Sequence, residues 1–486
     1  MKTTLLPIIR FFALLAIIQL APPKWVTGED FNFLLIMVDD LGKEWISCYG
    51  SEDVKTPHID ELAAEGMRFT NYYCMPQCTP SRVTLLTGQY PFRHGWVNHW
   101  DVPRWGGGCS FDPEKNPSFP KSLREAGWKT VVAGKWQIDD FRQEPKAMQQ
   151  AGFDHYCMWT GYETGNPKSG KRYQDPYIFC DGKSSSRPGK FGPDVFADYL
   201  VDFIDQADNQ PFFMYFPMVL THDPLVATPA EPKANTKLAK HKAMVRYTDE
   251  LVGRLLDALE KNHLRKKTIV IFTTDNGSSQ RITGHINGEA IRGGKSKTSE
   301  QGICVPLIAS CPGTIPSGVV SQALVDLTDL STTLCDLAGV PWKNSNRDGH
   351  SFQPVLRGAA VDTSREWIMA MGGGNHAKLT TAGVENQYWF RDRVLRNKHY
   401  KIYIGSDRKP QKLVHLANDP NEMEDLLASK DPEVNTARRI FRNAVEQMPK
   451  QDADPKYSPL SQRPWYLQPT TPSQVWKDGF PGNRLP

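Results

Sequence analysis

Short apolar runs alternate with helical patterns along the chain, and this alternation restricts the fold more than any other feature. The runs that predict buried strands are FNFLLIMVDD (31–40), WKTVVAGK (128–135), PFFMYFPM (211–218) and KTIVIFTTD (267–275). The run MRFTNYYC (67–74) predicts a further strand. Helical patterns cover residues 56–66, 80–86, 121–126 and 237–261. Strands that alternate with helices in this way form an α/β sheet covered by helices. With 486 residues, the chain is long enough for one large domain of this kind and a smaller companion.

Polar side chains stand at the ends of three predicted strands. Asp39 and Asp40 end the first strand, Lys135 ends another, and Asp275 and Asn276 follow the last. Ligands of open α/β sheets gather at the carboxyl ends of the strands. Carboxylate and amide oxygens suit a hard cation such as Ca²⁺, and the absence of His and Cys from this set argues against zinc. Taken singly, DDLG and DNG also resemble ordinary turns.

The stretch CTPSRVTLLTG (78–88) places a cysteine at the head of a helical run. Pro80 at the helix start puts Cys78 beside the N-terminus, where unpaired backbone N–H groups and the helix dipole favour an anion and increase cysteine reactivity. Arg82 follows about one turn later, so its guanidinium can reach an oxyanion near the same point. A buried cysteine with a solvated arginine is the plain alternative.

The same stretch resembles the signature of the type I sulfatases, the formylglycine-dependent branch of the alkaline-phosphatase superfamily. That signature is C-x-P-S-R, a short apolar step and T-G, and it is matched by Cys78, Pro80, Ser81, Arg82, Leu86, Thr87 and Gly88. Blocks such as YPFRHG, LREAGWKTVVAGKW, IVIFTTDNG and IRGGKSKTSEQGICVPLI also look like family blocks in family order. The resemblance implies a large mixed β-sheet between helices and a smaller C-terminal α+β domain with a short antiparallel sheet.

In such enzymes a maturation enzyme oxidises the signature cysteine to formylglycine, an aldehyde that hydrates to a geminal diol. The resemblance implies this modification for Cys78, so the thiol is the precursor of a nucleophile. One hydroxyl attacks the sulfur of a sulfate ester and expels the alcohol; the other then loses its proton, and sulfate is eliminated as the aldehyde returns. The chain is therefore predicted to be a sulfuric ester hydrolase that depends on a formylglycine-generating partner.

The resemblance also assigns roles to the other motif residues. The predicted ligands of one divalent ion, Ca²⁺ with Mg²⁺ as the alternative, are Asp39, Asp40, Asp275 and Asn276. Lys135 and Lys295 match the sulfate-binding lysines of the family, and Arg82 would hold the formylglycine side. His222 in THDPL corresponds to the leaving-group histidine, the expected general acid.

Gln137 departs from the family pattern, which continues GKW with a histidine. Glutamine can orient a hydroxyl but cannot accept its proton at neutral pH. A metal-bound or carboxylate group would then act as base, another histidine such as His94 or His285 would replace it, or turnover is impaired. Gln137 leaves open a sulfated-glycan binding protein with impaired turnover. The resemblance also leaves open a phosphonate or phosphate ester hydrolase of the same superfamily, because that branch uses the same nucleophile and metal site.

Aromatic and basic residues gather in two loop regions, 95–108 and 139–190. Aromatic rings stack on sugar faces and basic groups meet further sulfates, so these loops favour a sulfated carbohydrate over a small aryl ester. The predicted substrate-binding residues are Gln137, Trp100 and Arg172. The alternative is a polar surface loop with aromatic side chains such as Trp96, Trp159 and Tyr173 packed beneath it.

The N-terminus and the cysteine content favour export. Lys2 and Arg10 precede FFALLAIIQLA, which predicts a signal peptide over 1–28 and a periplasmic or extracellular protein, with an uncleaved anchor as the alternative. No other segment of the sequence predicts a membrane span. Among nine cysteines, Cys157 and Cys180 bracket a polar loop and could pair. A net charge of +4 is too small for a nucleic-acid binder with a broad basic face.

The chain is predicted to divide into a catalytic domain over 29–365, a smaller domain over 366–450 and a tail over 451–486. The smaller domain is indicated by RDRVLRNKHYKIYI, LVHLANDPNE and a helix from about 432 to 448. The tail contains seven prolines, too many for regular elements. The sequence indicates neither the oligomeric state nor the sugar.

Overall fold

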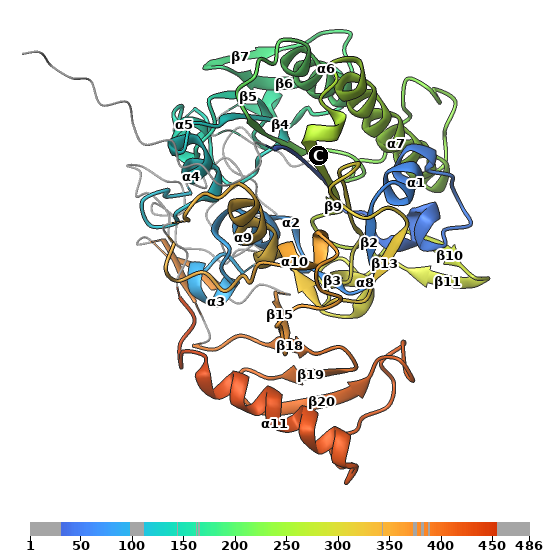
Figure 1. Ribbon diagram of the computed structural model, residues 1–486, viewed down its shortest axis with the longest axis vertical. Helices are drawn as coiled ribbons and strands as arrows, with labels where there is room; N and C mark the ends of the chain where they lie inside the picture. The colour runs from blue at the N-terminus through green and yellow to red at the C-terminus, as the bar shows by residue number, and fades with distance from the viewer. Residues whose placement is uncertain are drawn as a thin grey trace, which may run out of the picture.

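A ten-stranded mixed sheet forms the centre of the larger part of the molecule (Figure 1). Its spatial order is β13 (Val319–Ser321), β2 (Met67–Phe69), β12 (Leu307–Ser310), β9 (Thr268–Thr274), β1 (Asn32–Val38), β8 (Phe212–Pro217), β4 (Lys129–Lys135), β5 (His155–Trp159), β6 (Tyr177–Cys180) and β7 (Lys183–Ser186). The five strands from β9 to β5 run parallel, whereas β12, β6 and β7 pair antiparallel with their neighbours. The predicted α/β class with a mixed sheet is thus confirmed.

The computed structural model describes residues 31–97 and 111–453, except 143, 162, 164–165, 343, 373–376, 381–382 and 387–388. The predicted signal peptide, Trp100 and all but the first residues of the predicted tail lie outside this described part. The predicted domain boundaries stay predictions.

Strand β1 shows how the sheet buries both faces. Phe33, Leu35 and Met37 belong to one apolar core, while the alternate residues Leu34 and Ile36 belong to the other. The first core is covered by α2 (Cys78–Thr87), α4 (Phe119–Glu125), α5 (Ala147–Ala151) and α9 (Leu327–Leu337). The second core is covered by α1 (Pro57–Ala64), α6 (Gly192–Asp205) and α7 (Lys237–Lys261). A parallel strand covered on both faces is apolar throughout, which explains its continuous hydrophobic run.

A four-stranded antiparallel sheet forms the smaller part, drawn at the bottom of Figure 1. It consists of β15 (Ile368–Met371), β18 (Arg393–Arg396), β19 (Tyr400–Ile404) and β20 (Pro410–His415), and α11 (Pro432–Gln447) lies along it. Phe441 of α11 shares an apolar core with this sheet and with Tyr73 and Met75 of the larger part. The predicted C-terminal antiparallel sheet is confirmed.

Shorter elements connect these layers. They are α3 (Pro91–His94), α8 (Glu300–Ile303), α10 (Gln353–Leu356), β3 (Tyr72–Tyr73) paired with β14 (Val325–Asp326), the hairpin of β10 (Thr283–Ile286) and β11 (Glu289–Arg292), and the hairpin of β16 (Ala377–Thr380) and β17 (Gly383–Asn386). The run 67–74 therefore supplies two strands of different sheets.

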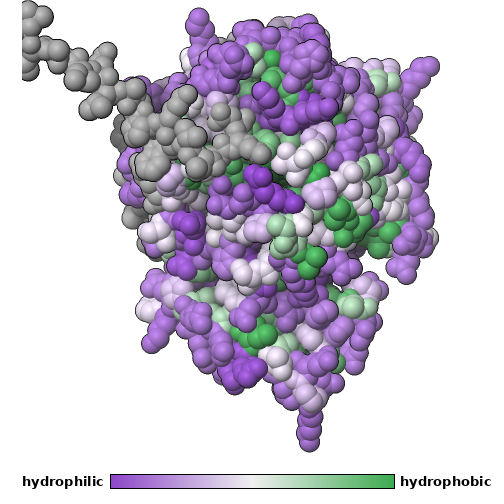
Figure 2. Space-filling model, viewed as in Figure 1, coloured by the Kyte–Doolittle hydropathy of each residue, from purple (hydrophilic) through white to green (hydrophobic). Residues whose placement is uncertain are grey.

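Cys157 and Cys180 form a disulfide between the neighbouring strands β5 and β6. The sequence had left this pairing open. Hydrophilic side chains cover most of the face shown in Figure 2, and hydrophobic ones gather there in small groups. Within the described part of the chain, no helix is long and apolar enough to cross a membrane.

Candidate active site

The parallel pairing of β1 with β9 brings two acidic strand ends together. Val38 and Thr274, the last residues of the two strands, are partners in the ladder. Asp39 and Asp275 are the next residues of each strand and therefore lie side by side at the same edge of the sheet. The backbone N–H of Asp40 donates to Asp275 Oδ1 at 3.2 Å, and Asn276 Nδ2 donates to Asp40 Oδ1 at 2.8 Å. All four side chains are buried. The sheet register itself therefore builds a cluster of oxygen donors.

The cluster fits a divalent cation. Asp39 Oδ1 and Asn276 Oδ1 are buried, and neither has a hydrogen-bond partner among the described residues. A buried polar atom without a partner is costly, and a cation would satisfy both oxygens. Ligand atoms of Asp39, Asp40 and His222 lie within 4.8 Å of one another, and so do those of Asp39, Cys78 and Asp275.

Each carboxylate of the cluster also has its own basic partner. Lys135 Nζ, at the end of β4, donates to Asp39 Oδ2 at 2.6 Å. Lys295 Nζ, from the loop after β11, donates to Asp40 Oδ2 at 2.6 Å.

Arg82 NH2, from α2, donates to Asp275 Oδ2 at 2.7 Å. Together with the two lysines, this arginine surrounds the acids with positive charge, as an anionic substrate requires.

The carboxyl groups differ in pKa because their surroundings differ. Burial alone would raise the pKa of Asp39, but Lys135 and the other nearby cations outweigh it and hold that pKa well below its usual range. Burial raises the pKa of Asp40 despite the opposing charge of Lys295. Burial, with the negative charge of Asp39, raises the pKa of Asp275 to about 7. A bound dication would favour the ionised form of all three groups.

Helix α2 begins at Cys78, which is 1% exposed. Ser81 Oγ fixes this helix start to the end of β9, because it lies 3.1 Å from the carbonyl oxygen of Met75 and 2.5 Å from that of Asp275. Gly88 ends the helix in the left-handed region with a φ of 62°. The helix N-terminus, and with it Cys78, is thereby held against the acidic cluster.

Arg82 connects three elements one turn after Cys78. Besides its bond to Asp275 on β9, its NH1 donates to the carbonyl oxygen of Lys135 on β4 at 2.8 Å. Its side chain is almost fully buried. Arg82 therefore fixes the relative positions of α2 and the two strand ends as well as supplying charge.

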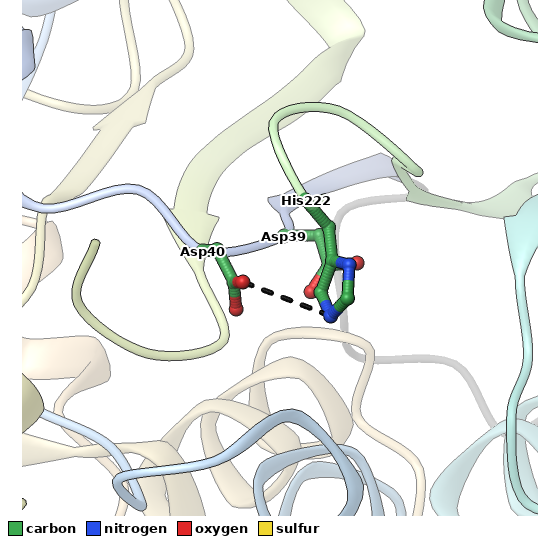
Figure 3. Close-up of side chains that lie close together, drawn as sticks. All are labelled: Asp39, Asp40 and His222. Carbon is green, nitrogen blue, oxygen red and sulfur yellow. Dashed lines mark ion pairs between the residues drawn. The ribbon is translucent and has the colours of Figure 1, made fainter. Parts of the chain in front are cut away.

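His222 reaches the same cluster from the loop after β8 (Figure 3). Its Nε2 lies 3.7 Å from Asp40 Oδ2. Burial, with the charge of Lys295 nearby, lowers the pKa of His222 well below its usual value. The contact with Asp40 therefore involves a neutral ring and is not an ion pair.

Arg172 selects the tautomer of this ring. Its NH2 lies 2.8 Å from His222 Nδ1, and a guanidinium can only donate. Nδ1 is therefore the acceptor, so its 2.7 Å contact with the carbonyl oxygen of Asp223 cannot also be a hydrogen bond. The ring proton then resides on Nε2, which faces Asp40.

Two aromatic side chains, Trp159 and Tyr173, contact Arg172 and the loop that carries His222. The Arg172 guanidinium lies 4.5 Å from the ring centroid of Trp159. Tyr173 Oη lies 2.8 Å from the carbonyl oxygen of Val219 and 2.5 Å from that of His222. Trp96, Trp159 and Tyr173 are all buried. No sequence motif predicted the contacts of Tyr173, because they depend on how distant loops meet. Ser81 belongs to the signature, but the signature did not indicate which groups its hydroxyl contacts.

Gln137 lies just after β4 in an unusual backbone conformation. Its φ is 69°, its side chain is buried, and its Oε1 has no partner among the described residues. The two histidines considered as replacements are engaged elsewhere. His285 Nδ1 lies 2.9 Å from Asp53 Oδ2, and His94 Nδ1 accepts the N–H of Trp96 at 3.0 Å.

Comparison with known proteins identifies the family. A family model described as Sulfatase matches residues 31–340, more than half of the chain. This chain belongs to the sulfatase family. A second model, described as N-sulphoglucosamine sulphohydrolase, C-terminal, matches residues 294–451. The predicted membership of the type I sulfatases is confirmed, and the chain is a sulfuric ester hydrolase.

The sulfatase has relatives in animals and bacteria. It is 32% identical to N-acetylgalactosamine-6-sulfatase from Canis lupus familiaris over 383 residues, which cover 74% of this chain and 72% of that protein. It is 29% identical to N-acetylgalactosamine-6-O-sulfatase from Bacteroides thetaiotaomicron, with 83% of this chain and 90% of that protein covered.

A solved structure shares the fold of the sulfatase. The crystal structure of Ps i-CgsB in complex with k-i-k-neocarrahexaose has a TM-score of 0.72 and 24% identity. The match covers 89% of this chain and 95% of that one.

The sulfatase thus brings most of its sequence-predicted site residues together. The group around the acidic cluster comprises Asp39, Asp40, Cys78, Arg82, Lys135, His222, Asp275, Asn276 and Lys295. The family uses a divalent metal, and the buried donor set fits one. Arg172 contacts His222, and its predicted substrate contact stays a prediction, as do the individual catalytic roles.

Proposed function

We propose that this sulfatase removes sulfate esters from a sulfated carbohydrate through a formylglycine formed from Cys78. One observation carries the proposal: Cys78 begins a buried helix, and its Sγ lies within 4.8 Å of ligand oxygens of Asp39 and Asp275. The precursor of the nucleophile therefore lies next to the residues that would bind the cation. We propose Ca²⁺ as the ion, with Mg²⁺ as the alternative, because all donors are oxygens.

The residues around this point have different proposed roles. When formed, the hydrated formylglycine supplies the hydroxyl that attacks sulfur, and a bound cation polarises a sulfate oxygen. Lys135 and Lys295 neutralise charge on the transferring group. Arg82 holds the nucleophile side through its fixed contacts with β4 and β9.

His222 was expected from the sequence to be the general acid, but with a neutral ring we propose it as the hydrogen-bond donor to the leaving group. Its Nε2–H donates a hydrogen bond to the oxygen of the departing alcohol and stabilises the charge that develops there as the S–O bond breaks, and water supplies the proton that completes the alcohol. Arg172 supports this role because it keeps the proton on Nε2. The second hydroxyl of the diol then loses its proton, the C–O bond to the sulfate breaks and the aldehyde returns; water rehydrates the aldehyde, so the net change is ester plus water to alcohol plus sulfate.

The names of the relatives support the proposed substrate class. Two of the relatives are sulfatases whose names specify a sulfated N-acetylgalactosamine, and a structure of the same fold was solved with a neocarrahexaose. A sulfated sugar is therefore the substrate we propose for this chain. We also propose that the chain is exported, because the run FFALLAIIQLA has the features of a signal peptide.

Mass spectrometry of the Cys78 peptide tests the nucleophile. The native peptide should carry an aldehyde in place of the thiol, and Cys78→Ala should lower sulfate release by about 1,000-fold or more while circular dichroism stays unchanged. Cys335→Ala, at a buried cysteine of α9, is the control and should keep its activity. A native peptide that retains sulfur throughout would exclude the formylglycine.

A substrate panel tests the ester class. Sulfated monosaccharides, an aryl sulfate and a phosphonate ester are compared with protein that carries formylglycine. We expect kcat/KM to be highest for a sulfated sugar. Dominant turnover of the phosphonate would reject this choice, and binding without any sulfate release would support the impaired alternative that Gln137 suggests.

A further inference from the structure

Helix α8 packs against the segment that carries Lys295. A Cβ at Gly294 would lie 2.4 Å from the backbone nitrogen of Gly302 in α8, so any side chain at this position would clash. The carbonyl oxygen of Gly302 also accepts the backbone N–H of Gly277 at 3.0 Å. The loop that begins at Gly277 in turn holds Lys295, because the carbonyl oxygen of Ser278 accepts its N–H at 3.0 Å. The position of Lys295 therefore depends on the position of α8.

The first turn of α8 is held by a side chain of the smaller part of the molecule. Ser299, the N-cap residue, makes no capping hydrogen bond with its own side chain. The Glu422 carboxylate supplies the acceptor instead, because its Oε1 accepts the backbone N–H of Glu300 at 2.9 Å. The first N–H groups of a helix have no partner within it, so an acceptor from another element fixes where the helix begins. Glu422 therefore fixes the end of α8 that is nearest in sequence to Lys295.

Glu422 is itself held firmly by β19. Its side chain is buried, Lys401 Nζ donates to its Oε1 at 3.0 Å, and Tyr403 Oη donates to its Oε2. Its backbone N–H donates to the carbonyl oxygen of Asp419 at 3.1 Å and so closes a turn. Its φ is 58°, a left-handed conformation that glutamate seldom adopts. Such a conformation persists only where the surroundings determine it, so the place of this carboxylate is determined by the smaller part.

We propose that Glu422 is a positioning residue for Lys295 in sulfate ester hydrolysis. The carboxylate fixes the start of α8, and α8 fixes the segments that hold Lys295 against Asp40. The smaller part thereby helps to build the reaction centre, and the last residue of LVHLANDPNE has a role beyond the fold of that part. The proposal rests on the role proposed above for Lys295, the neutralisation of charge on the transferring group.

Variants in one loop test the proposal. Glu422→Met removes the acceptor, whereas Glu422→Gln keeps an oxygen that can accept the N–H of Glu300. Asp425→Ala is the matched control. The Asp425 carboxylate also accepts two backbone N–H groups, those of Leu413 and Leu427, both at 3.0 Å, but neither group belongs to α8.

We expect Glu422→Met to lower kcat by about 10- to 100-fold and to change KM by less than about 3-fold, because a displaced Lys295 fails where charge builds up in the transition state. Glu422→Gln should stay within about 3-fold of the wild type, and Asp425→Ala within about 2-fold. Steady-state sulfate release well below the Tm of each variant measures both constants. A loss of kcat in Glu422→Met no larger than that in Asp425→Ala would overturn the proposal.

A double-mutant cycle separates positioning from a general effect on the fold. If Glu422 acts through Lys295, then Glu422→Met should change the rate by less than about 2-fold in an enzyme that already carries Lys295→Met. Single-turnover rates at high enzyme concentration make this slow double variant measurable. A purely structural role would lower the rate by the same factor in both backgrounds, and that result would contradict positioning.

Circular dichroism and Tm show whether Glu422→Met folds. If it does not, Glu422→Asp replaces it in both experiments, because it keeps the charge beside Lys401 but is one methylene shorter and draws the carboxylate away from Glu300. Glu422→Asp should also lower kcat, by about 5-fold or more. An unchanged kcat in that variant would reject the positioning role.

Lys295→Met alone distinguishes the two levels of the proposal. If this variant lowered kcat while the Glu422 variants did not, only the positioning role of Glu422 would be rejected. If Lys295→Met left kcat unchanged, the proposed role of Lys295 would fail, and the positioning role of Glu422 would fail with it.

Discussion

Arg172 shows how a single side chain can determine the chemistry of its neighbour. Its guanidinium stacks on Trp159 and donates to His222 Nδ1, which leaves the imidazole proton on Nε2. A ring that donates a hydrogen bond to the leaving group must carry its proton on the nitrogen that faces that group. Arg172 is therefore a positioning residue for His222 in the proposed mechanism.

Arg172→Met should lower kcat by about 10- to 100-fold with a smaller change in KM, because the ring proton is then no longer confined to Nε2. Arg172→Lys keeps a donor and should recover part of the loss. Steady-state sulfate release measures both effects. Lys171→Met, at the exposed neighbouring position, is the control and should stay within about 2-fold. Equal losses in the Arg172 and Lys171 variants would contradict the positioning role.

At this scale the sequence predicted the residues that belong to motifs, and it also predicted Arg172 as a substrate-binding residue, but it did not predict the contacts that depend on loop packing. The clustering of Asp39, Asp275 and Lys135 could be expected from their places at strand ends. Tyr173 and Arg172 meet the His222 loop only after chain segments far apart in sequence have folded together. No local pattern encodes that meeting.

Helix α1 is fixed at its N-terminus by α7. The Asp249 carboxylate of α7 accepts the backbone N–H of Ile59 at 2.9 Å and that of His58 at 3.3 Å. These groups belong to the first turn of α1, whose N–H groups have no partner within the helix. Asp249 thus acts as a cap supplied by another element.

The Asp249 cap should depend on pH. Burial raises the pKa of Asp249 to about 6. The unfolded chain has a value near 3.9. The folded protein therefore holds the proton more tightly, and the stability that this contributes is present below about pH 4 and lost as the pH rises through about 6.

Asp249→Ala should lower the free energy of unfolding by about 1 kcal/mol near pH 7.5, because two donors lose their acceptor. Near pH 4.5 the loss should be larger by about 2 kcal/mol, given a pKa of about 6 in the folded protein and near 3.9 in the unfolded chain. Urea denaturation at both pH values measures the difference, and Glu250→Ala, exposed on the same helix, is the control. A loss that shrinks at the lower pH would contradict the raised pKa.

Helices were predicted with the right bounds where the repeat of apolar residues extends over many residues. Helix α7 has the predicted bounds, 237–261. Helix α2 begins at Cys78 and not at Pro80, because proline is tolerated throughout the first turn, where no N–H bond is lost. The run 67–74 was predicted as one strand, but β2 pairs with β12 and β13 while β3 pairs with β14.

A buried ionic network joins the four-stranded sheet to helix α8 and strand β3 of the larger part. Lys401 of β19 is fully buried and lies 3.3 Å from Glu300 Oε1 of α8 and 3.0 Å from Glu422 Oε1. Tyr73 Oη donates to Glu300 Oε2 at 2.7 Å. The network therefore connects the C-terminal sheet to the segment that follows Lys295.

Lys401→Met should lower the free energy of unfolding by about 3–5 kcal/mol, since two acids lose their buried partner. Lys398→Met removes an exposed ion pair with Asp362 near the same sheet and should cost less than about 1 kcal/mol. Chemical denaturation monitored by tryptophan fluorescence measures both. A similar small loss in the two variants would mean that the network contributes little.

The pairing of β1 with β9 has a consequence for how such a protein can diversify. Asp39 and Asp275 are anchored by hydrogen bonds of the central ladder, whereas nearby residues such as His241 and Arg281 come from a helix and a loop outside it. Substitutions in such peripheral segments can therefore leave the geometry of the acidic cluster unchanged. The cluster and the segments around it can thus change independently of each other.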